Sequence, residues 1–190
     1  MKIDYIPCDA RNYRNDARDL SSIEFIVMHY TANNGDTARN NGEYFGREYV
    51  EASAHYFVDS NEIVQSVLDK YIAWHCGGPL ESSHHPLRGI CTNSNSIGVE
   101  LCSIIQNGKY AFKQETVNLA AELTRYLMSR YNIDIDHVVR HYDVTGKTCP
   151  APFVYREDQW KKFKELLVKK EEKKVTYNEF KQFMLRYEAE

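Results

Sequence analysis

The amino-acid sequence predicts an α/β layered domain with a further helix at its C-terminal end. Short runs rich in apolar and β-branched residues are typical of buried strands, and they alternate with longer segments whose apolar residues recur at helical spacing. The 190 residues are enough for one well-buried domain and a small extra element. We therefore expect one domain over residues 1–168, followed by a charged linker and a short amphipathic helix over residues 169–190.

The composition is that of an ordinary globular protein, with 43% hydrophobic residues, 27% charged residues and a formal net charge of −3. Broad nucleic-acid binding needs a basic face, so we do not expect it. No apolar run approaches the roughly 20 residues that span a membrane. Residues 1–16 lack the apolar stretch of a secretory signal, which predicts synthesis in the cytoplasm without one. The five scattered cysteines argue against a disulfide framework.

The first third of the chain predicts three strands and one helix. Residues 24–30 (EFIVMHY) form an apolar, β-branched run typical of a buried strand, after an irregular polar segment over residues 1–22. Residues 31–48 predict a polar loop that leads into a helix. Residues 53–59 and 62–68 predict the two strands of a β-hairpin.

A long loop separates this hairpin from the next strand. Residues 76–95 hold three of the nine glycines and two of the five prolines, and loops of this length are usually functional or disordered. Residues 96–102 (SIGVELC) predict a strand. Side-chain alternation gives it an apolar face formed by Ile97, Val99 and Leu101. Glu100 points to the opposite face.

The second half predicts two helices, the end of a strand and the terminal extension. Residues 115–131 have an apolar helical face formed by Val117, Ala120, Ala121, Thr124, Leu127, Met128 and Tyr131. Residues 136–141 (DHVVRH) predict a strand end. Residues 157–170 predict a helix with the stripe Trp160, Phe163 and Leu167. After the charge run at 169–174, a T-x-x-E capping box predicts the final helix, whose apolar face is Tyr177, Phe180, Met184 and Tyr187.

Three potential metal ligands stand at or after the ends of predicted strands. His29 and His141 each end a strand, and Cys149 follows across a turn eased by Gly146. Two imidazoles and a thiolate, without a fourth protein ligand, match a catalytic zinc site that keeps one position open for water. However, the spacing contains no tight metal-binding signature, and a histidine at a strand end is commonly a polar edge residue. These residues alone leave both interpretations open.

Glu100 and Lys147 extend the zinc hypothesis. A carboxylate on so apolar a strand is costly to bury without a partner or a task, and one such task is that of a general base beside a metal. Lys147, two residues before Cys149, could stabilise an oxyanion beside the metal. The common alternatives are a solvent-facing glutamate on an edge strand and a solvated lysine in a turn.

Five segments resemble, in order and spacing, the type-2 N-acetylmuramoyl-L-alanine amidases, which include phage endolysins and bacterial autolysins and are related to the peptidoglycan recognition proteins. The segments are FIVMHYTA, SAHYFVD, AWHCGG, NSNSIGVEL and HYDVTGKTCP, within residues 20–155. The resemblance implies a central mixed β-sheet flanked by helices, with the site in a groove roofed by residues 76–95. It also implies hydrolysis of the amide bond between the lactyl group of N-acetylmuramic acid and L-alanine of the peptidoglycan stem peptide.

The resemblance further implies a role for each candidate residue, with residues 1–168 as the catalytic domain. The implied Zn²⁺ ligands are His29, His141 and Cys149. The implied catalytic residues are Glu100, as general base, and Lys147, which would stabilise the tetrahedral intermediate. The implied substrate-binding residues are Trp74 and His75. Ala54 stands where some relatives have a tyrosine, which favours the branch that relies on Glu100 and leaves His55 without an assigned role.

Several alternatives stay open at this point. A recognition module that binds muropeptides without cutting them would typically lack the cysteine ligand, so Cys149 favours the enzyme. A zinc peptidase acting within the stem peptide is a third possibility. The missing secretory signal fits an endolysin released through a holin-type pore and also a cytoplasmic enzyme that recycles wall fragments. The cysteine ligand favours the lysin.

Two further features have no assigned task. The helix predicted over residues 175–190 could dock on the domain, self-associate or begin a wall-targeting module. Cys76 and Cys91 flank the long loop and could pair in an oxidising medium, while His84 and His85 within it are expected to be solvated.

Overall fold

A six-stranded mixed β-sheet forms the centre of the protein. The computed structural model describes residues 2–78 and 85–168, and in this part the strand order is β1-β5-β4-β7-β3-β10. The strands are β1 (Ile3–Tyr5), β3 (Phe25–Tyr30), β4 (Tyr56–Val58), β5 (Ile63–Gln65), β7 (Ser96–Leu101) and β10 (Val138–Arg140). Strands β4, β7, β3 and β10 run parallel, whereas β5 is antiparallel to β4 and parallel to β1. The expected central mixed sheet is confirmed.

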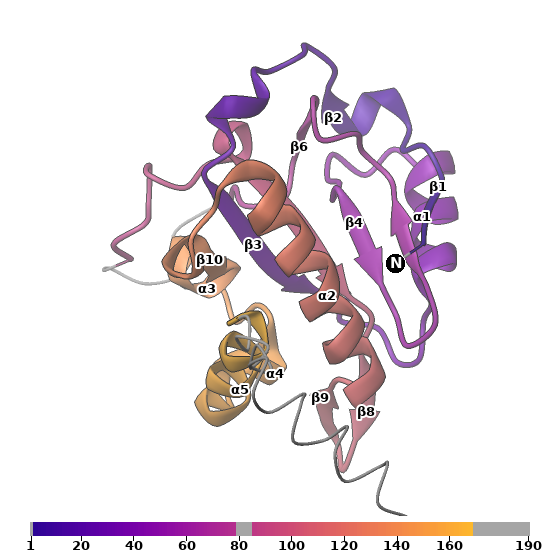
Figure 1. Ribbon diagram of the computed structural model, residues 1–190. Coiled ribbons are helices and arrows are strands. Elements are labelled where there is room, and N and C mark those ends of the chain that lie inside the picture. The colour runs from indigo at the N-terminus through magenta and orange to yellow at the C-terminus, as the bar shows by residue number, and fades with distance from the viewer. Residues whose placement is uncertain (1, 79–84, 169–190) are drawn as a thin grey trace, which may run out of the picture.

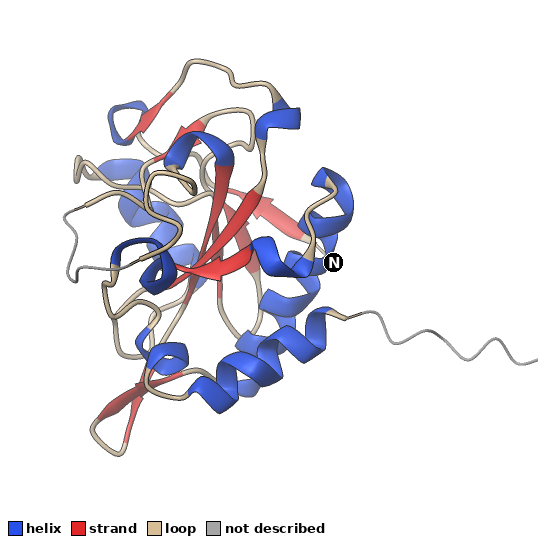
Figure 2. Ribbon diagram, turned by 90° about the vertical axis from the view of Figure 1, so that its left-hand side faces the viewer, coloured by secondary structure: helices blue, strands red, loops and turns tan. Residues whose placement is uncertain are grey.

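Helices cover both faces of this sheet (Figures 1 and 2). Helix α2 (Gln114–Tyr131) crosses the front face in Figure 1 and contacts α5 (Glu157–Leu167), while α1 (Ala38–Arg47) packs against β4 and β5. The short helices α3 (His141–Thr145) and α4 (Ala151–Val154) connect β10 to α5. Two small antiparallel pairs complete the fold: β2 (Tyr13–Arg14) with β6 (Ile72–Ala73), and β8 (Ile104–Gln106) with β9 (Lys109–Ala111).

The main hydrophobic core lies between α2, α5 and one face of the sheet. Ile26 and Met28 of β3 pair with Ile97 and Val99 of β7, and all four side chains are fully buried. The predicted helical stripes complete this core with Ala120, Ala121, Leu127, Trp160, Phe163 and Leu167. Because the apolar residues of β3 and β7 alternate with others, the opposite face of the same strands is free for polar residues.

Some segments differ from the sequence prediction. Residues 1–22 were expected to be irregular but contain β1 and β2, whose two or three residues are stabilised by pairing with distant strands rather than by a local pattern. The hairpin β8–β9 was missed, although Asn107 and Gly108, both with positive φ, form the two-residue turn that an Asn-Gly pair favours. Residues 169–190, with the predicted linker and helix, lie outside the described residues.

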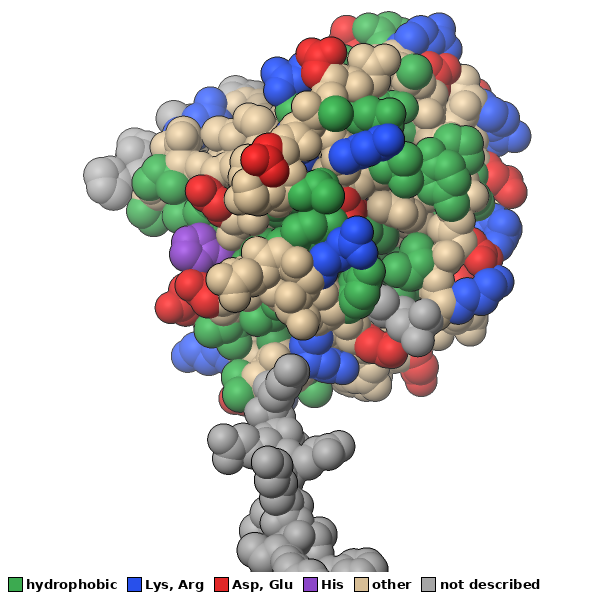
Figure 3. Space-filling view, turned by 45° about the horizontal axis from the view of Figure 1, so that its top comes forward, with side chains coloured by type: hydrophobic (Ala, Val, Ile, Leu, Met, Phe, Trp, Pro, Cys, Tyr) green, Lys and Arg blue, Asp and Glu red, His purple; other side chains and the backbone are tan. Residues whose placement is uncertain are grey.

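The surface is mixed in character. On the face shown in Figure 3, basic and acidic side chains are interspersed with apolar patches, so that face carries no large field of one sign. Among the described residues, no helix combines the length and apolar character that crossing a membrane requires.

Candidate metal centre and groove

The candidate site lies on the face of the sheet opposite to α2, at the carboxyl ends of parallel strands. His29 of β3 and Glu100 of β7 are direct neighbours in the strand register. Val139 of β10 pairs with Val27, and His141 follows directly after the end of β10, with its ring centroid 4.8 Å from that of His29. His141 therefore extends the row that His29 and Glu100 begin.

Cys149 reaches this row because the chain folds back after β10. His141 was expected to end a strand but instead begins α3, whose last residue, Thr145, is followed by Gly146. The φ of Gly146 is 84°, a left-handed conformation that glycine adopts at low cost and that turns the chain out of the helix. The backbone N–H of Tyr142 then donates to the carbonyl oxygen of Cys149 at 2.8 Å, which fixes the returning segment beside the start of α3.

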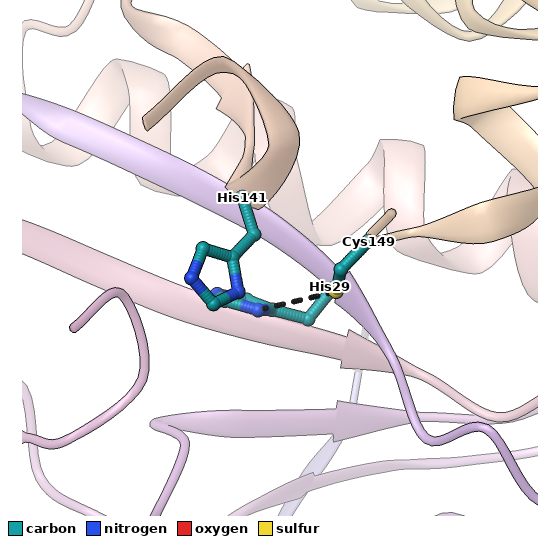
Figure 4. Close-up of side chains that lie close together, drawn as sticks. All are labelled: His29, His141 and Cys149. Atoms are coloured by element: carbon teal, nitrogen blue, oxygen red, sulfur yellow. Dashed lines mark hydrogen bonds between the residues drawn. The ribbon is translucent and has the colours of Figure 1, made fainter. Parts of the chain in front are cut away.

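His29, His141 and Cys149 form a buried cluster that can hold a metal ion (Figure 4). Their ligand atoms lie within 4.8 Å of one another, and Nδ1 of His29 is 3.6 Å from Sγ of Cys149. Tetrahedral zinc bonds of about 2.0–2.1 Å to nitrogen and about 2.3 Å to sulfur would separate these two ligands by about 3.6 Å. Both ring nitrogens of His141 are buried without a hydrogen-bond partner in the described chain. A bound cation would satisfy the one of these two nitrogens that keeps its lone pair in the neutral ring.

Burial controls the protonation of the cluster. Burial, followed by the nearby charge of Lys147, lowers the pKa of His141 to about 4. Burial also lowers the pKa of His29 well below its ordinary value, with a further contribution from His141. Both rings are therefore neutral near pH 7, which is the form that binds metals. Burial raises the pKa of the Cys149 thiol, so a bound cation is needed to favour its thiolate.

Glu100 lies beside the cluster, lines the groove and is only partly exposed. Its Oε2 atom is buried and has no hydrogen-bond partner among the described residues. Burial raises the pKa of Glu100 to about 8, against the opposing effect of the Lys147 ammonium. Lys147 itself is exposed at the rim of the site. An unpartnered carboxyl group next to potential metal ligands is able to exchange a proton with water or substrate.

A groove of about 710 Å³ leads away from these residues. Trp74 and His75 line it, together with Glu100 and Lys147. Its lining also includes residues that the sequence did not single out: Asn40, Asn41, Tyr44 and Phe45 of α1, and Ala52. The signal in this stretch was the helix predicted after the polar loop within residues 31–48. None of the described residues of the 76–95 loop lines this groove, and residues 79–84 of the expected roof lie outside the described residues.

Tyr56 and His55, which lie near the site, make contacts that stabilise the fold. The Tyr56 hydroxyl lies on the α2 side of the sheet and donates to Asp69 at 2.8 Å, so it cannot replace the tyrosine that some relatives have at Ala54. His55 is fully buried; its Nδ1 accepts from the backbone N–H of Gly98 at 3.0 Å, and its Nε2 lies 3.2 Å from the carbonyl oxygen of Tyr71. His55 therefore joins β7 to the residue that precedes β6.

Other cysteines and histidines that the sequence raised lie outside the cluster. Cys76 and Cys91 are buried free thiols on the site side of the sheet. The ring of His85 contacts Tyr142, with centroids 5.4 Å apart, whereas His84 lies outside the described residues. His137 is partly exposed and bonds to Asp134.

Comparison with known proteins identifies the family to which these features correspond. Residues 19–152 match the N-acetylmuramoyl-L-alanine amidase family. The amidase BlyA of Bacillus subtilis is 36% identical over 168 residues, which cover 84% of this chain and 44% of BlyA. The amidase CwlL of Bacillus licheniformis is 36% identical over 157 residues, covering 80% and 42% of the two chains. The chain thus spans less than half the length of these two relatives.

Solved structures agree with this comparison. The catalytic domain of XlyA, a Bacillus subtilis amidase, superimposes with a TM-score of 0.69 at 28% identity, covering 88% of this chain and 100% of that domain. A mutant endolysin from Bacillus subtilis gives a TM-score of 0.69 at 27% identity, with coverage of 88% and 99%. The α/β fold seen here is therefore the fold of these two structures.

Proposed function

Because the chain belongs to the N-acetylmuramoyl-L-alanine amidase family, we propose that it hydrolyses the amide bond between N-acetylmuramic acid and L-alanine in peptidoglycan stem peptides. One observation carries the proposal. A cluster of two histidines and a cysteine, with unpartnered ligand atoms, adjoins an unpartnered buried carboxyl group in one groove. We propose Zn²⁺ as the cofactor, since thiolate and imidazole ligands favour zinc over magnesium or calcium.

Each of these residues would have its own role in the hydrolysis. Zinc held by His29, His141 and Cys149 would polarise the scissile carbonyl group and acidify water at the site. Glu100 accepts a proton from the attacking water on its buried carboxyl group and passes it to the leaving amine of L-alanine. Lys147 supplies positive charge for the oxyanion of the tetrahedral intermediate. Trp74 contributes an apolar wall that orients the substrate along the groove.

We also propose a biological setting. The likeness to a solved endolysin supports a phage endolysin or a related bacterial lysin. Such an enzyme is made in the cytoplasm, reaches the cell wall after holin-type release and has peptidoglycan as its partner.

The first test is product analysis on purified peptidoglycan. We expect the wild-type protein to release new N-terminal L-alanine without new reducing sugar ends, and a chelator to abolish this release. In Glu100→Gln the loss of the general base lowers kcat by about 10²–10⁴-fold. The matched control is Glu115→Gln, an exposed glutamate in the first turn of α2.

Three results would contradict the proposal in different ways. Binding to peptidoglycan without any product would assign the chain to the non-catalytic recognition class. New amino groups from residues other than alanine would indicate a zinc peptidase. Full activity of Glu100→Gln would remove Glu100 from the role of general base.

A further inference from the structure

His75 stands at the centre of a hydrogen-bonded chain that ends at His29. Nδ1 of His75 lies 3.1 Å from Nε2 of His29, and Nε2 of His75 lies 3.2 Å from the hydroxyl oxygen of Ser96. The Ser96 hydroxyl in turn donates to the carbonyl oxygen of Thr92 at 2.5 Å. The chain therefore runs from a backbone carbonyl, through a serine and a histidine, to a candidate metal ligand.

The positions of the hydrogen atoms in this chain follow from counting donors. Ser96 has a single hydroxyl hydrogen, which it gives to Thr92, so it can only accept from His75. Nε2 of His75 therefore carries a hydrogen. No acidic group pairs with His75 among the described residues, and a partly buried imidazole without such a partner is neutral near pH 7. Nδ1 of His75 is then an acceptor, and Nε2 of His29 must be the donor.

This order decides which nitrogen of His29 is free. Because Nε2 of His29 carries the hydrogen, Nδ1 keeps its lone pair, and Nδ1 is the atom that lies 3.6 Å from Sγ of Cys149. In the other neutral tautomer the hydrogen would sit on Nδ1 and point toward Cys149. That tautomer cannot bind a metal through Nδ1, because a ring nitrogen needs its lone pair for coordination.

Gly98 gives the His75 ring its place. A Cβ atom at position 98 would lie 2.6 Å from Cγ of His75, far inside any normal contact, so the ring rests directly on the backbone of β7. His55 also fixes the backbone at Gly98, because its Nδ1 accepts a hydrogen bond from the Gly98 N–H. The ring of His75 is thus located by the sheet itself.

We propose that His75 is a positioning residue that fixes the tautomer of His29 and so presents Nδ1 of His29 as a ready metal ligand. This inference rests on the proposed metal site and adds to it a residue that does not bind the metal. Hydrogen bonds from metal-binding histidines to a second layer of acceptors set ring orientation and ligand basicity, and losing them weakens metal binding about 10–100-fold.

Two substitutions of His75 distinguish the effect of its hydrogen-bond acceptor from the effect of its ring shape. His75→Phe keeps a planar ring over Gly98 but has no acceptor, and we expect it to weaken zinc binding by about 10–100-fold. In His75→Asn the Oδ1 atom can take the place of Nδ1, so affinity should stay close to that of the wild type. Zinc affinity is measured by competition with a chromogenic chelator, independently of catalysis. His137→Asn serves as the control for losing an imidazole elsewhere.

The tautomer is measured directly by ¹⁵N NMR of histidine in the metal-free protein. We expect His29 to carry its proton on Nε2 in the wild type and in His75→Asn, and to populate the Nδ1-protonated form in His75→Phe. Unchanged zinc affinity in a folded His75→Phe would overturn the inference, as would equal losses in both variants. Failure of the wild type to bind zinc would instead refute the proposed cofactor, while the NMR result would still decide the tautomer.

Discussion

Lys147 influences the three candidate metal ligands and Glu100 from an exposed position. Its charge lowers the pKa values of His29, His141, Glu100 and Cys149. One cation at the rim thus favours neutral imidazoles and ionised acids in the same site. The same field would stabilise negative charge that develops on a substrate oxygen in the groove.

We predict that Lys147→Gln slows the chemical step more than it weakens substrate binding. The oxyanion charge exists only in the intermediate, so kcat should fall by about 10²–10³-fold while KM changes little. The measurement is steady-state kinetics on a soluble muropeptide. Lys161→Gln, an exposed lysine of α5, should behave as the wild type. A rise in KM at constant kcat would show that Lys147 only binds the ground state.

At the scale of secondary structure, Arg140 joins α3, which carries His141, to the two helices that follow Cys149. Its guanidinium donates to both carboxylate oxygens of Asp143 in α3, to the carbonyl oxygen of Phe153 in α4 and to Glu157 in α5. The side chain is 11% exposed and lies over the ring of Trp160. Arg140 therefore fixes the start of α3, where His141 lies, to the helices that follow Cys149.

We predict that Arg140→Met lowers the free energy of unfolding by about 2–3 kcal/mol, since hydrogen bonds to charged groups are lost in a largely buried place. The matched control is Arg156→Met, which removes an exposed pair with Asp158 and should change stability little. Urea unfolding of both variants measures the difference. Equal losses would mean that the buried network contributes no more than a surface ion pair.

At the scale of the whole molecule, the sheet separates two different environments. One face packs an apolar core against α2 and α5, while the other buries polar groups that include His29, His55 and His141. Burial, then the charges of His75 and Arg18, lowers the pKa of His55 well below its ordinary value of 6.5. The folded state therefore binds fewer protons at this residue than the unfolded chain.

The sign of the resulting pH effect is fixed. The contribution of a neutral His55 is fully present above pH 6.5, the value for an unperturbed histidine, and is lost as the pH falls below it, because the unfolded chain then takes up a proton. We predict that the stability of the metal-free protein declines on acidification. The slope should be shallower in His55→Gln by up to about 1.4 kcal/mol per pH unit. Chemical unfolding over a pH series measures it, with the exposed His137→Gln as control. Equal slopes would contradict the prediction.

The local sequence pattern was enough to predict the positions of the longest helices and strands. Helix α2 and the stripe of α5 have regular apolar spacing, and β3 and β7 have β-branched runs, so their positions follow from the chain itself. Strands β1 and β2 could not be predicted in this way because two or three residues hold no period, and they exist only by pairing with β5 and β6. The α1 side of the groove was missed because its residues share no chemical motif.

The sequence by itself determined the fold class, the main helices and strands, and the candidate set His29, Glu100, His141, Lys147 and Cys149. These depend on residue type, alternation and motif, which are all local properties of the chain. Only the tertiary structure decided that His29 and Glu100 are neighbours, that Tyr56 faces away and that His75 bonds to His29. Such facts depend on strand register and on hydrogen bonds between distant segments, which are set by packing the whole chain at once.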